Sequence, residues 1–198
     1  MTSFPGTGRA VHRLSRLTLV FASVAALAAC SDPYGPRTWN PEPTTLTLYS
    51  ASRAEYTGLV SAVDLTPEPV FGVSIEAPGA TGNWDFVLAD QAGALVLVPA
   101  GTFAPIQSRA RIATLEGIDL EDVREAPRDT TAYTASAVQL RTDVVYVLRS
   151  RRGSCGLTTG HRYAKMQAVE LDQARGIARL AIIRNPYCDD RALVPPSS

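Results

Sequence analysis

The chain has 198 residues with nineteen basic and nineteen acidic side chains, so its formal net charge is zero. This balance disfavours nucleic acid as a partner, because no excess of positive charge is present to follow a phosphate backbone. Residues 1–29, which we predict to be removed, contain three of the basic residues and none of the acidic ones, so the mature chain has a net charge of −3.

The first thirty residues have the pattern of an export signal. Arg9, Arg13 and Arg16 precede an apolar run from Leu17 to Ala29. A run of thirteen residues is too short to cross a hydrocarbon core of about 30 Å as a helix. The pattern therefore predicts a signal peptide, residues 1–29, rather than a permanent transmembrane helix.

The signal ends in Leu27-Ala28-Ala29-Cys30, which resembles the lipobox of bacterial lipoproteins. The resemblance implies cleavage before Cys30 and acylation of this residue by several fatty-acid chains such as palmitate, which together hold a protein stably on a membrane. Ser31 stands where an aspartate would resemble an inner-membrane retention signal, so we expect the outer membrane, on either of its faces. The alternatives are an ordinary secretory signal with a nearby cysteine, or a buried helix.

The mature chain divides into a tether and one domain. Residues 30–43 hold the lipidated cysteine and four prolines, a composition typical of an extended linker. Residues 44–198 are long enough for a single domain with a sizeable core. Short β-branched or aromatic runs alternate there with turn residues, and they predict strands at 44–50, 54–63, 70–76, 84–90, 94–98, 109–115, 136–140, 144–150, 162–171 and 177–184.

We therefore expect an all-β, antiparallel sandwich or a partly open barrel with at most one short helix. Residues 144–150 are apolar on both faces, which favours a central strand. Residues 162–171 and 177–184 should pair as a hairpin, because the link between them ends in Gly176. A helical turn is predicted from Asp119 to Arg124.

The cysteines predict a disulfide. With Cys30 lipidated, Cys155 and Cys188 remain as an even pair in a compartment that permits oxidation. The competing interpretation makes Cys155 a nucleophile with His161 as its base, but the spacing matches no known motif. His161 is also the only histidine after the signal, which disfavours a serine triad and a zinc site.

Other charged and aromatic residues have a structural and a functional interpretation. The acidic residues between Glu116 and Glu125 form a solvated face or, as the alternative, a calcium site. Arg149, Arg151 and Arg152 are expected to form a solvated rim. Trp84 is expected in the core of a half-buried strand, and the alternative is a tryptophan that stacks on a ligand. We expect no metal and no cofactor.

Four segments resemble the HmuY-type lipoproteins, an all-β family whose best-known members capture haem. They are WDF at 84–86, DLEDVREAP at 119–127, VVYVLRSRRG at 144–153 and RYAKMQAVEL at 162–171. The resemblance covers about residues 45–185 and implies a single-domain, ligand-binding β protein of the periplasm or cell surface. Haem-binding members hold the iron between two histidines or methionines. Here His161 and Met166 do not align with such a pair, so the resemblance does not imply that this chain binds haem.

The sequence thus predicts a lipid-anchored envelope protein with a non-enzymatic binding or interaction role. Its expected partners are the membrane, through the anchor, and a small apolar ligand or an envelope protein. The alternative is capture of haem or another apolar small ligand, with Trp84, His161 and Met166 as candidate ligand-binding residues. An enzyme is the third class, and it would require a cleft that joins His161 to carboxylates.

Overall fold

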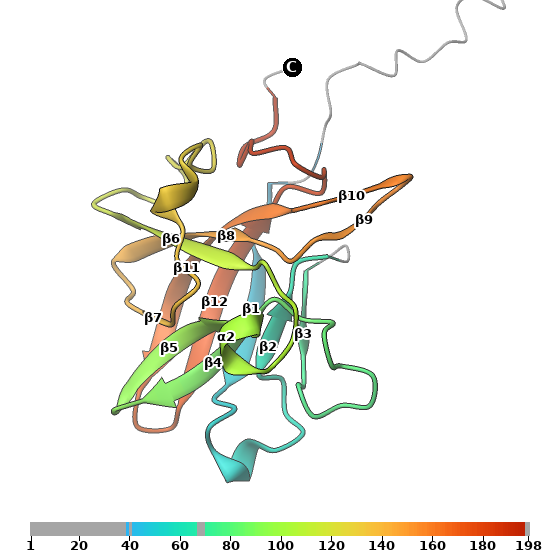
Figure 1. The fold of residues 1–198 in the computed structure, drawn as a ribbon. Helices are drawn as coiled ribbons and strands as arrows, with labels where there is room; N and C mark the ends of the chain where they lie inside the picture. The colour runs from blue at the N-terminus through green and yellow to red at the C-terminus, as the bar shows by residue number, and fades with distance from the viewer. Residues whose placement is uncertain (1–38, 40, 67–69, 197–198) are drawn as a thin grey trace, which may run out of the picture. The chain divides into compact units, whose positions relative to one another are not determined.

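The computed structural model describes residues 39, 41–66 and 70–196, and two antiparallel five-stranded sheets account for most of its regular structure (Figure 1). The first sheet has the order β1 (Thr44–Tyr49), β12 (Ile177–Arg184), β11 (Tyr163–Asp172), β8 (Val144–Arg149) and β6 (Arg111–Glu116). The second has the order β3 (Phe71–Val73), β2 (Ala62–Asp64), β4 (Phe86–Gln91), β5 (Ala94–Pro99) and β7 (Val138–Gln139). A separate hairpin consists of β9 (Gly153–Cys155) and β10 (Thr158–Gly160).

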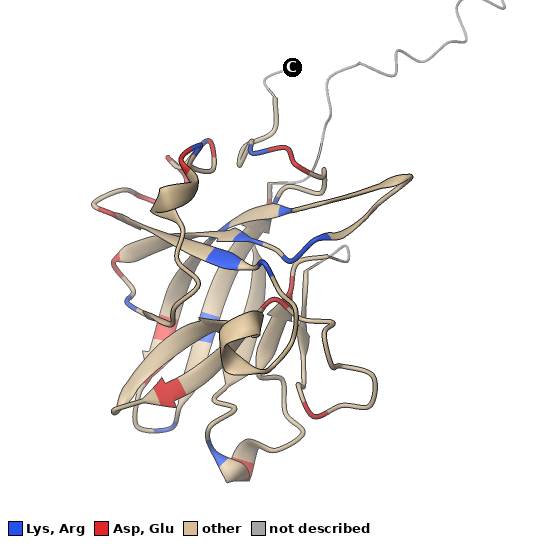
Figure 2. Ribbon diagram, viewed as in Figure 1, with Lys and Arg blue, Asp and Glu red and all other residues tan. Residues whose placement is uncertain are grey.

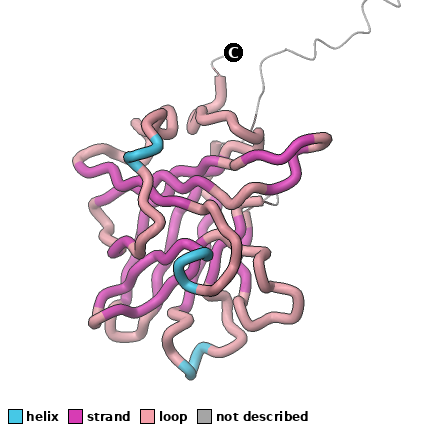
Figure 3. The backbone as a smooth tube through the Cα atoms, viewed as in Figure 1, coloured by secondary structure: helices cyan, strands magenta, loops and turns pink. Residues whose placement is uncertain are grey.

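Helical structure is confined to short segments (Figure 3). They are α2 (Ala100–Phe103) and the 3-10 turns η1 (Ala54–Tyr56) and η2 (Thr130–Ala132). The all-β class is therefore confirmed, and the sheets form a sandwich rather than a closed barrel. None of the helices among the described residues combines the length and hydrophobicity that a bilayer crossing requires.

The main core lies between the two sheets. Both sheets contribute apolar side chains to it, including Phe86 and Leu97 from one and Tyr146 and Met166 from the other. Because side chains alternate along a strand, every second residue of β8 points into this core. Two of the remaining residues of β8, Val145 and Val147, join a second apolar cluster on the outer face of the first sheet. Strand β8 pairs on both edges, so its predicted central position is confirmed.

The second cluster is covered by irregular chain. Leu120, Val123 and Leu193 pack on the outer face of the first sheet, and Trp39 packs against the same cluster. Residue 39 lies in the predicted tether, so the tether already contacts the domain there. The whole arrangement belongs to one compact unit, Thr38–Ser197.

The predicted hairpin of the last two strands is confirmed. Strands β11 and β12 pair from Ala164 opposite Arg184 to Asp172 opposite Ile177, with a bulge between Ala168 and Glu170. Gly176 has a φ of 69°, which a side chain would disfavour. Alternation along β11 places Met166 in the main core and Lys165 on the outer face, where its ammonium donates to the carbonyl of Val123 at 3.0 Å.

Three local predictions are wrong. Residues 54–63 do not form one strand, because η1 occupies the first part and β2 begins only at Ala62. Residues 119–124 form a hydrogen-bonded turn, Asp122 N–H to Asp119 O at 3.1 Å, but no helix. The backbone after this turn forms hydrogen bonds with the C-terminal segment instead of continuing a helix. For example, Leu193 N–H donates to the Arg124 carbonyl at 2.8 Å. The β9–β10 hairpin, between the predicted strands 144–150 and 162–171, was not predicted.

Candidate anion-binding site

Arginines cross one end of the first sheet in register. Arg111 lies opposite Arg149 on adjacent strands, Arg149 lies opposite Tyr163, and Ala164 lies opposite Arg184. Arg162 directly precedes Tyr163, and the loop after β8 adds Arg151 and Arg152. Figure 2 shows these basic segments side by side at the same end of the sheet. This end of the first sheet therefore concentrates arginines, although the chain as a whole is not basic.

A buried ion network fixes Arg151. Its guanidinium forms two hydrogen bonds with Asp64, Nη1 to Oδ1 at 2.8 Å and Nη2 to Oδ2 at 3.1 Å. The same Nη1 lies 3.2 Å from Oδ1 of Asp85. A two-pronged contact of this kind holds a guanidinium in one orientation. Our expectation of a solvated rim is therefore wrong for Arg151, whose side chain is mostly buried.

Asp85 joins the two sheets at this end. Its carboxylate is fully buried and accepts two backbone hydrogen bonds, from Leu65 N–H after β2 at 2.8 Å and from Arg151 N–H after β8 at 2.6 Å. Burial raises the pKa of Asp85 to about 6, although the Arg151 guanidinium and these two N–H donors act in the opposite direction. A carboxylate in this position needs its partners, because an unpaired buried charge is costly.

A cleft of about 530 Å³ opens above this network. Three arginines line it, Arg109, Arg151 and Arg152, and its other lining residues are uncharged: Thr66, Gly82, Asn83, Gln107, Ser108, Gly153 and Ser154. Arg152 donates one hydrogen bond to the carbonyl of Thr159 at 3.1 Å. The Arg109 side chain forms no hydrogen bond or ion pair with the described residues. The cleft thus offers unused guanidinium donors and no lining carboxylate.

Further polar atoms without partners lie beside the cleft. Among the described residues, Thr66 Oγ1 and the Nε and Nη1 atoms of Arg162 are buried and lack hydrogen bonds. Both side chains border Gly153: a Cβ at this position would lie 3.1 Å from Thr66 Cγ2 and 3.6 Å from Arg162 Nη1. Because Gly153 carries no side chain, these polar groups approach the hairpin closely. Buried donors without partners mark a place where a polar group is accommodated.

The predicted disulfide is confirmed. Cys155 in β9 and Cys188 after β12 are bonded, with their Cα atoms 6.0 Å apart. The bond ties the turn end of the β9–β10 hairpin, where Cys155 pairs with Thr158, to the C-terminal segment. It also excludes Cys155 as a free nucleophile. Cys30, the predicted lipidation site, lies outside the described residues, so its acylation stays a prediction.

The three candidate ligand-binding residues lie in three different surroundings. Met166 is fully buried in the core between the sheets. Trp84 is buried on the outer face of the second sheet, where its ring meets that of Phe103 edge to face. It precedes β4 and packs with Val87 on the outer face, whereas Phe86 points into the main core.

His161 is half-buried beside β10, with Nδ1 2.7 Å from the Ser150 carbonyl. Burial lowers its pKa. The backbone N–H of His161, not its ring, contacts the Asp189 carboxylate at 2.9 Å. Among the described residues, neither a methionine nor a carboxylate forms a hydrogen bond with this imidazole. None of the three candidates lines the arginine cleft.

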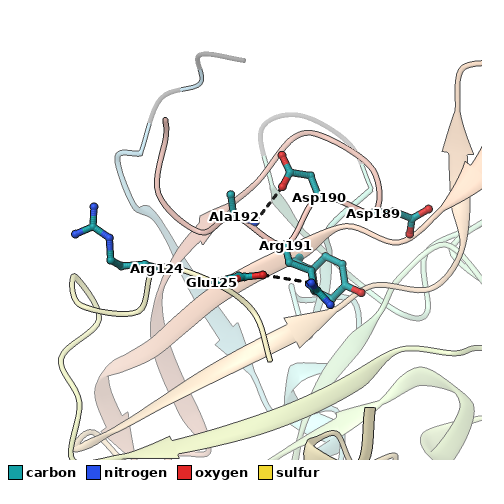
Figure 4. Close-up of a pocket in the computed structure, with 7 residues that line it drawn as sticks. Arg124, Glu125, Asp189, Asp190, Arg191 and Ala192 are labelled. Carbon is teal, nitrogen blue, oxygen red and sulfur yellow. Dashed lines mark hydrogen bonds and ion pairs between the residues drawn. The ribbon is translucent and has the colours of Figure 1, made fainter. Parts of the chain in front are cut away.

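A second cleft, of about 510 Å³, lies on the side of the C-terminal segment (Figure 4). Its charges are mixed: Arg191 pairs with Glu125 at 3.3 Å, and Asp190 accepts from the Ala192 N–H at 3.0 Å. Figure 4 shows Arg124 pointing away from the Glu125–Arg191 pair. Opposite charges that already neutralise one another favour no single class of ligand. In the part of the chain that the structure describes, no group of three His, Cys, Asp or Glu residues is arranged to hold a metal ion.

No protein-family model, curated protein or solved structure matches the chain.

Sequence reasoning missed the cleft because its parts come from separate segments. Asp64 ends β2, Asp85 precedes β4 and Arg151 follows β8. One signal was available. Both aspartates interrupt apolar runs, Ala62-Val63-Asp64-Leu65 and Trp84-Asp85-Phe86-Val87, and a carboxylate inside an apolar run needs a buried partner.

Proposed function

We propose that the protein is a lipid-anchored envelope protein that acts by binding rather than catalysis, and that its arginine cleft takes a small anionic group, a carboxylate or a phosphate. The observation that carries the proposal is the lining of the cleft, with three arginines and no acidic residue. Guanidinium groups match the geometry of carboxylates and phosphates and form their strongest hydrogen bonds with them.

The distribution of charge around the cleft supports the same ligand class. Arg151 is held by Asp64 and Asp85, so its positive charge is balanced within the buried network. Both acids are already paired with it, and they lie beneath the cleft rather than in its lining. Arg109 and Arg152 are exposed at the mouth and supply charge that this pairing does not neutralise. Arg109 and Arg152 are therefore the arginines available to an anion, because both Nη atoms of Arg151 already bond Asp64.

The proposed location in the cell envelope rests on the lipobox-like sequence Leu27-Ala28-Ala29-Cys30. The Cys155–Cys188 disulfide supports it, because such bonds persist in oxidising compartments such as the periplasm. Membership of the HmuY-type lipoproteins is a proposal that rests on the four similar segments. Capture of haem stays the alternative to an anionic ligand, and a titration with haemin that leaves the Soret band unshifted would rule out axial ligation.

Calorimetric titration of residues 31–198 with inorganic phosphate, and separately with succinate, tests the cleft. We expect saturable binding of at least one anion. Arg152→Gln should weaken it about tenfold, because one charge-assisted hydrogen bond contributes about 1.5 kcal/mol. The matched control is Arg175→Gln, since Arg175 lies in the turn between β11 and β12 at the other end of the sheet. Equal affinities for the wild type and Arg152→Gln, or no saturable binding of either anion, would contradict the proposal.

A further inference from the structure

The tether enters the domain at the end that carries the arginine cleft. Strand β1 begins at Thr44, which lies opposite Ile182, two residues before β12 ends at Arg184. The β9–β10 hairpin connects the last residues of β8 to the first residues of β11 and so projects from this same end (Figure 1). The start of the domain, the cleft and the hairpin are thus neighbours.

The distance from the predicted anchor to this end is bounded by the length of the chain. Trp39 packs against the second apolar cluster, and eight residues separate it from Cys30 in the sequence. A fully extended chain advances at most about 3.6 Å per residue, so an acylated Cys30 lies within roughly 30 Å of Trp39. A tether of this length allows the end where the chain enters the domain to reach the bilayer surface.

The hairpin is suited to contact a membrane. Residues 153–160 contain no charged side chain, and Leu157 at the tip is fully exposed. Gly156, before the leucine, has a φ of 73°, which closes the tight turn. Arg152 and Arg162 brace the two arms through the carbonyls of Thr159 and Ser154. The hairpin thus presents one exposed leucine with basic residues at its base, and apolar burial together with attraction to anionic lipids are the two terms that bind a protein to a membrane interface.

Two acidic residues lie near the hairpin and accept hydrogen bonds from backbone N–H groups, which leave their negative charge in place. Asp189 lies behind Gly160 and accepts the N–H of His161 at 2.9 Å, and Asp190 accepts the N–H of Ala192. Neither lines the arginine cleft. The side of this end that carries the cleft therefore presents Arg109 and Arg152 to an approaching anionic surface.

We propose that this end of the domain docks on a bilayer, with Leu157 inserted at the interface and the phosphate of an anionic lipid headgroup in the arginine cleft. The inference rests on the proposed function and names the source of its anion. A soluble anion would need only the cleft. A lipid phosphate also accounts for the exposed leucine and for the entry of the tether at the same end.

Flotation of residues 31–198 with vesicles tests the docking without the anchor. We expect binding to vesicles of phosphatidylcholine mixed with phosphatidylglycerol and little binding to phosphatidylcholine alone. Arg109→Gln and Arg152→Gln should each weaken binding about fivefold, the effect of one basic residue near an anionic surface, and raised salt should weaken it further. Leu157→Ala should weaken it by a similar factor. The control is Leu59→Ala, at an exposed leucine three residues after Tyr56, whose hydroxyl bonds the Arg175 carbonyl at the other end.

The outcomes separate the two proposals. Binding of inorganic phosphate without binding to anionic vesicles would overturn docking and leave the anion site standing. Vesicle binding that is unchanged by Leu157→Ala and by Arg152→Gln would overturn docking through this end. Binding of neither phosphate, succinate nor vesicles would overturn both.

Discussion

Replacement of Asp85 by alanine is expected to lower the free energy of unfolding by about 3–5 kcal/mol. The substitution leaves Arg151 with only one of its two carboxylate partners and removes the acceptor of two backbone N–H groups, those of Leu65 and Arg151. Buried N–H donors without acceptors destabilise the folded state, and so does a buried guanidinium whose charge is balanced by fewer carboxylates. Because Asp85 links β2 to the loop after β8, the loss also loosens the end of the sandwich beneath the cleft.

Urea denaturation of residues 31–198 measures this effect. The matched control is Asp143→Ala, whose exposed carboxylate pairs with Arg141 at 2.6 Å. A surface pair of this kind contributes at most about 1 kcal/mol. A loss at Asp85 no larger than the loss at Asp143 would show that the buried network does not hold the two sheets together at this end.

The pH dependence of stability gives a second measure of the same residue. The pKa of Asp85 is raised by burial from 3.8 to about 6, so the folded state binds a proton more tightly than the unfolded state does. Its contribution to stability is therefore fully present below pH 3.8 and is lost as the pH rises toward 6. Two pKa units correspond to about 3 kcal/mol. The difference in stability between the wild type and Asp85→Asn should change over this pH range and stay constant above it.

Loss of the disulfide is the second large effect. In the double variant Cys155→Ser and Cys188→Ser, the free energy of unfolding should fall by about 3–4 kcal/mol, because the bond closes a loop with a sequence separation of 33. Reduction of the wild type should reproduce the loss, whereas reductant should not affect the double variant. The hairpin strands β9 and β10 pair only with each other, so their amide protons should exchange fastest after reduction. A wild type whose stability is unchanged by reduction would contradict the account.

The first sheet could be predicted well because its strands are long and regularly patterned. Strands β8, β11 and β12 alternate over six to ten residues, and their predicted bounds agree with the structure within one residue. The second sheet was harder, since β2, β3 and β7 have three residues or fewer and pair over too short a length to leave a periodic signal. The hairpin β9–β10 is rich in glycine and threonine and carries no apolar alternation at all.

Of the functional features, the sequence predicted the disulfide but not the arginine cleft. An even pair of cysteines indicates a bond without any knowledge of the fold, and the bond between Cys155 and Cys188 is present. The anion cleft depends on tertiary contacts, because Asp64, Asp85 and Arg151 are brought together from three separate segments of the sequence. A lone histidine and a lone methionine suggested a ligand site, but alternation along β11 places Met166 in the core.

We propose that the protein is exported and held on a membrane through Cys30. Intact-mass analysis of the protein purified from the membrane fraction of its native cells, beside a Cys30→Ala variant, tests it directly. The account predicts a mature chain that begins at Cys30 and carries the mass of several acyl chains, and a variant that is not acylated. A native chain that begins at Met1, carries no acyl mass and lies in the cytoplasm would contradict it.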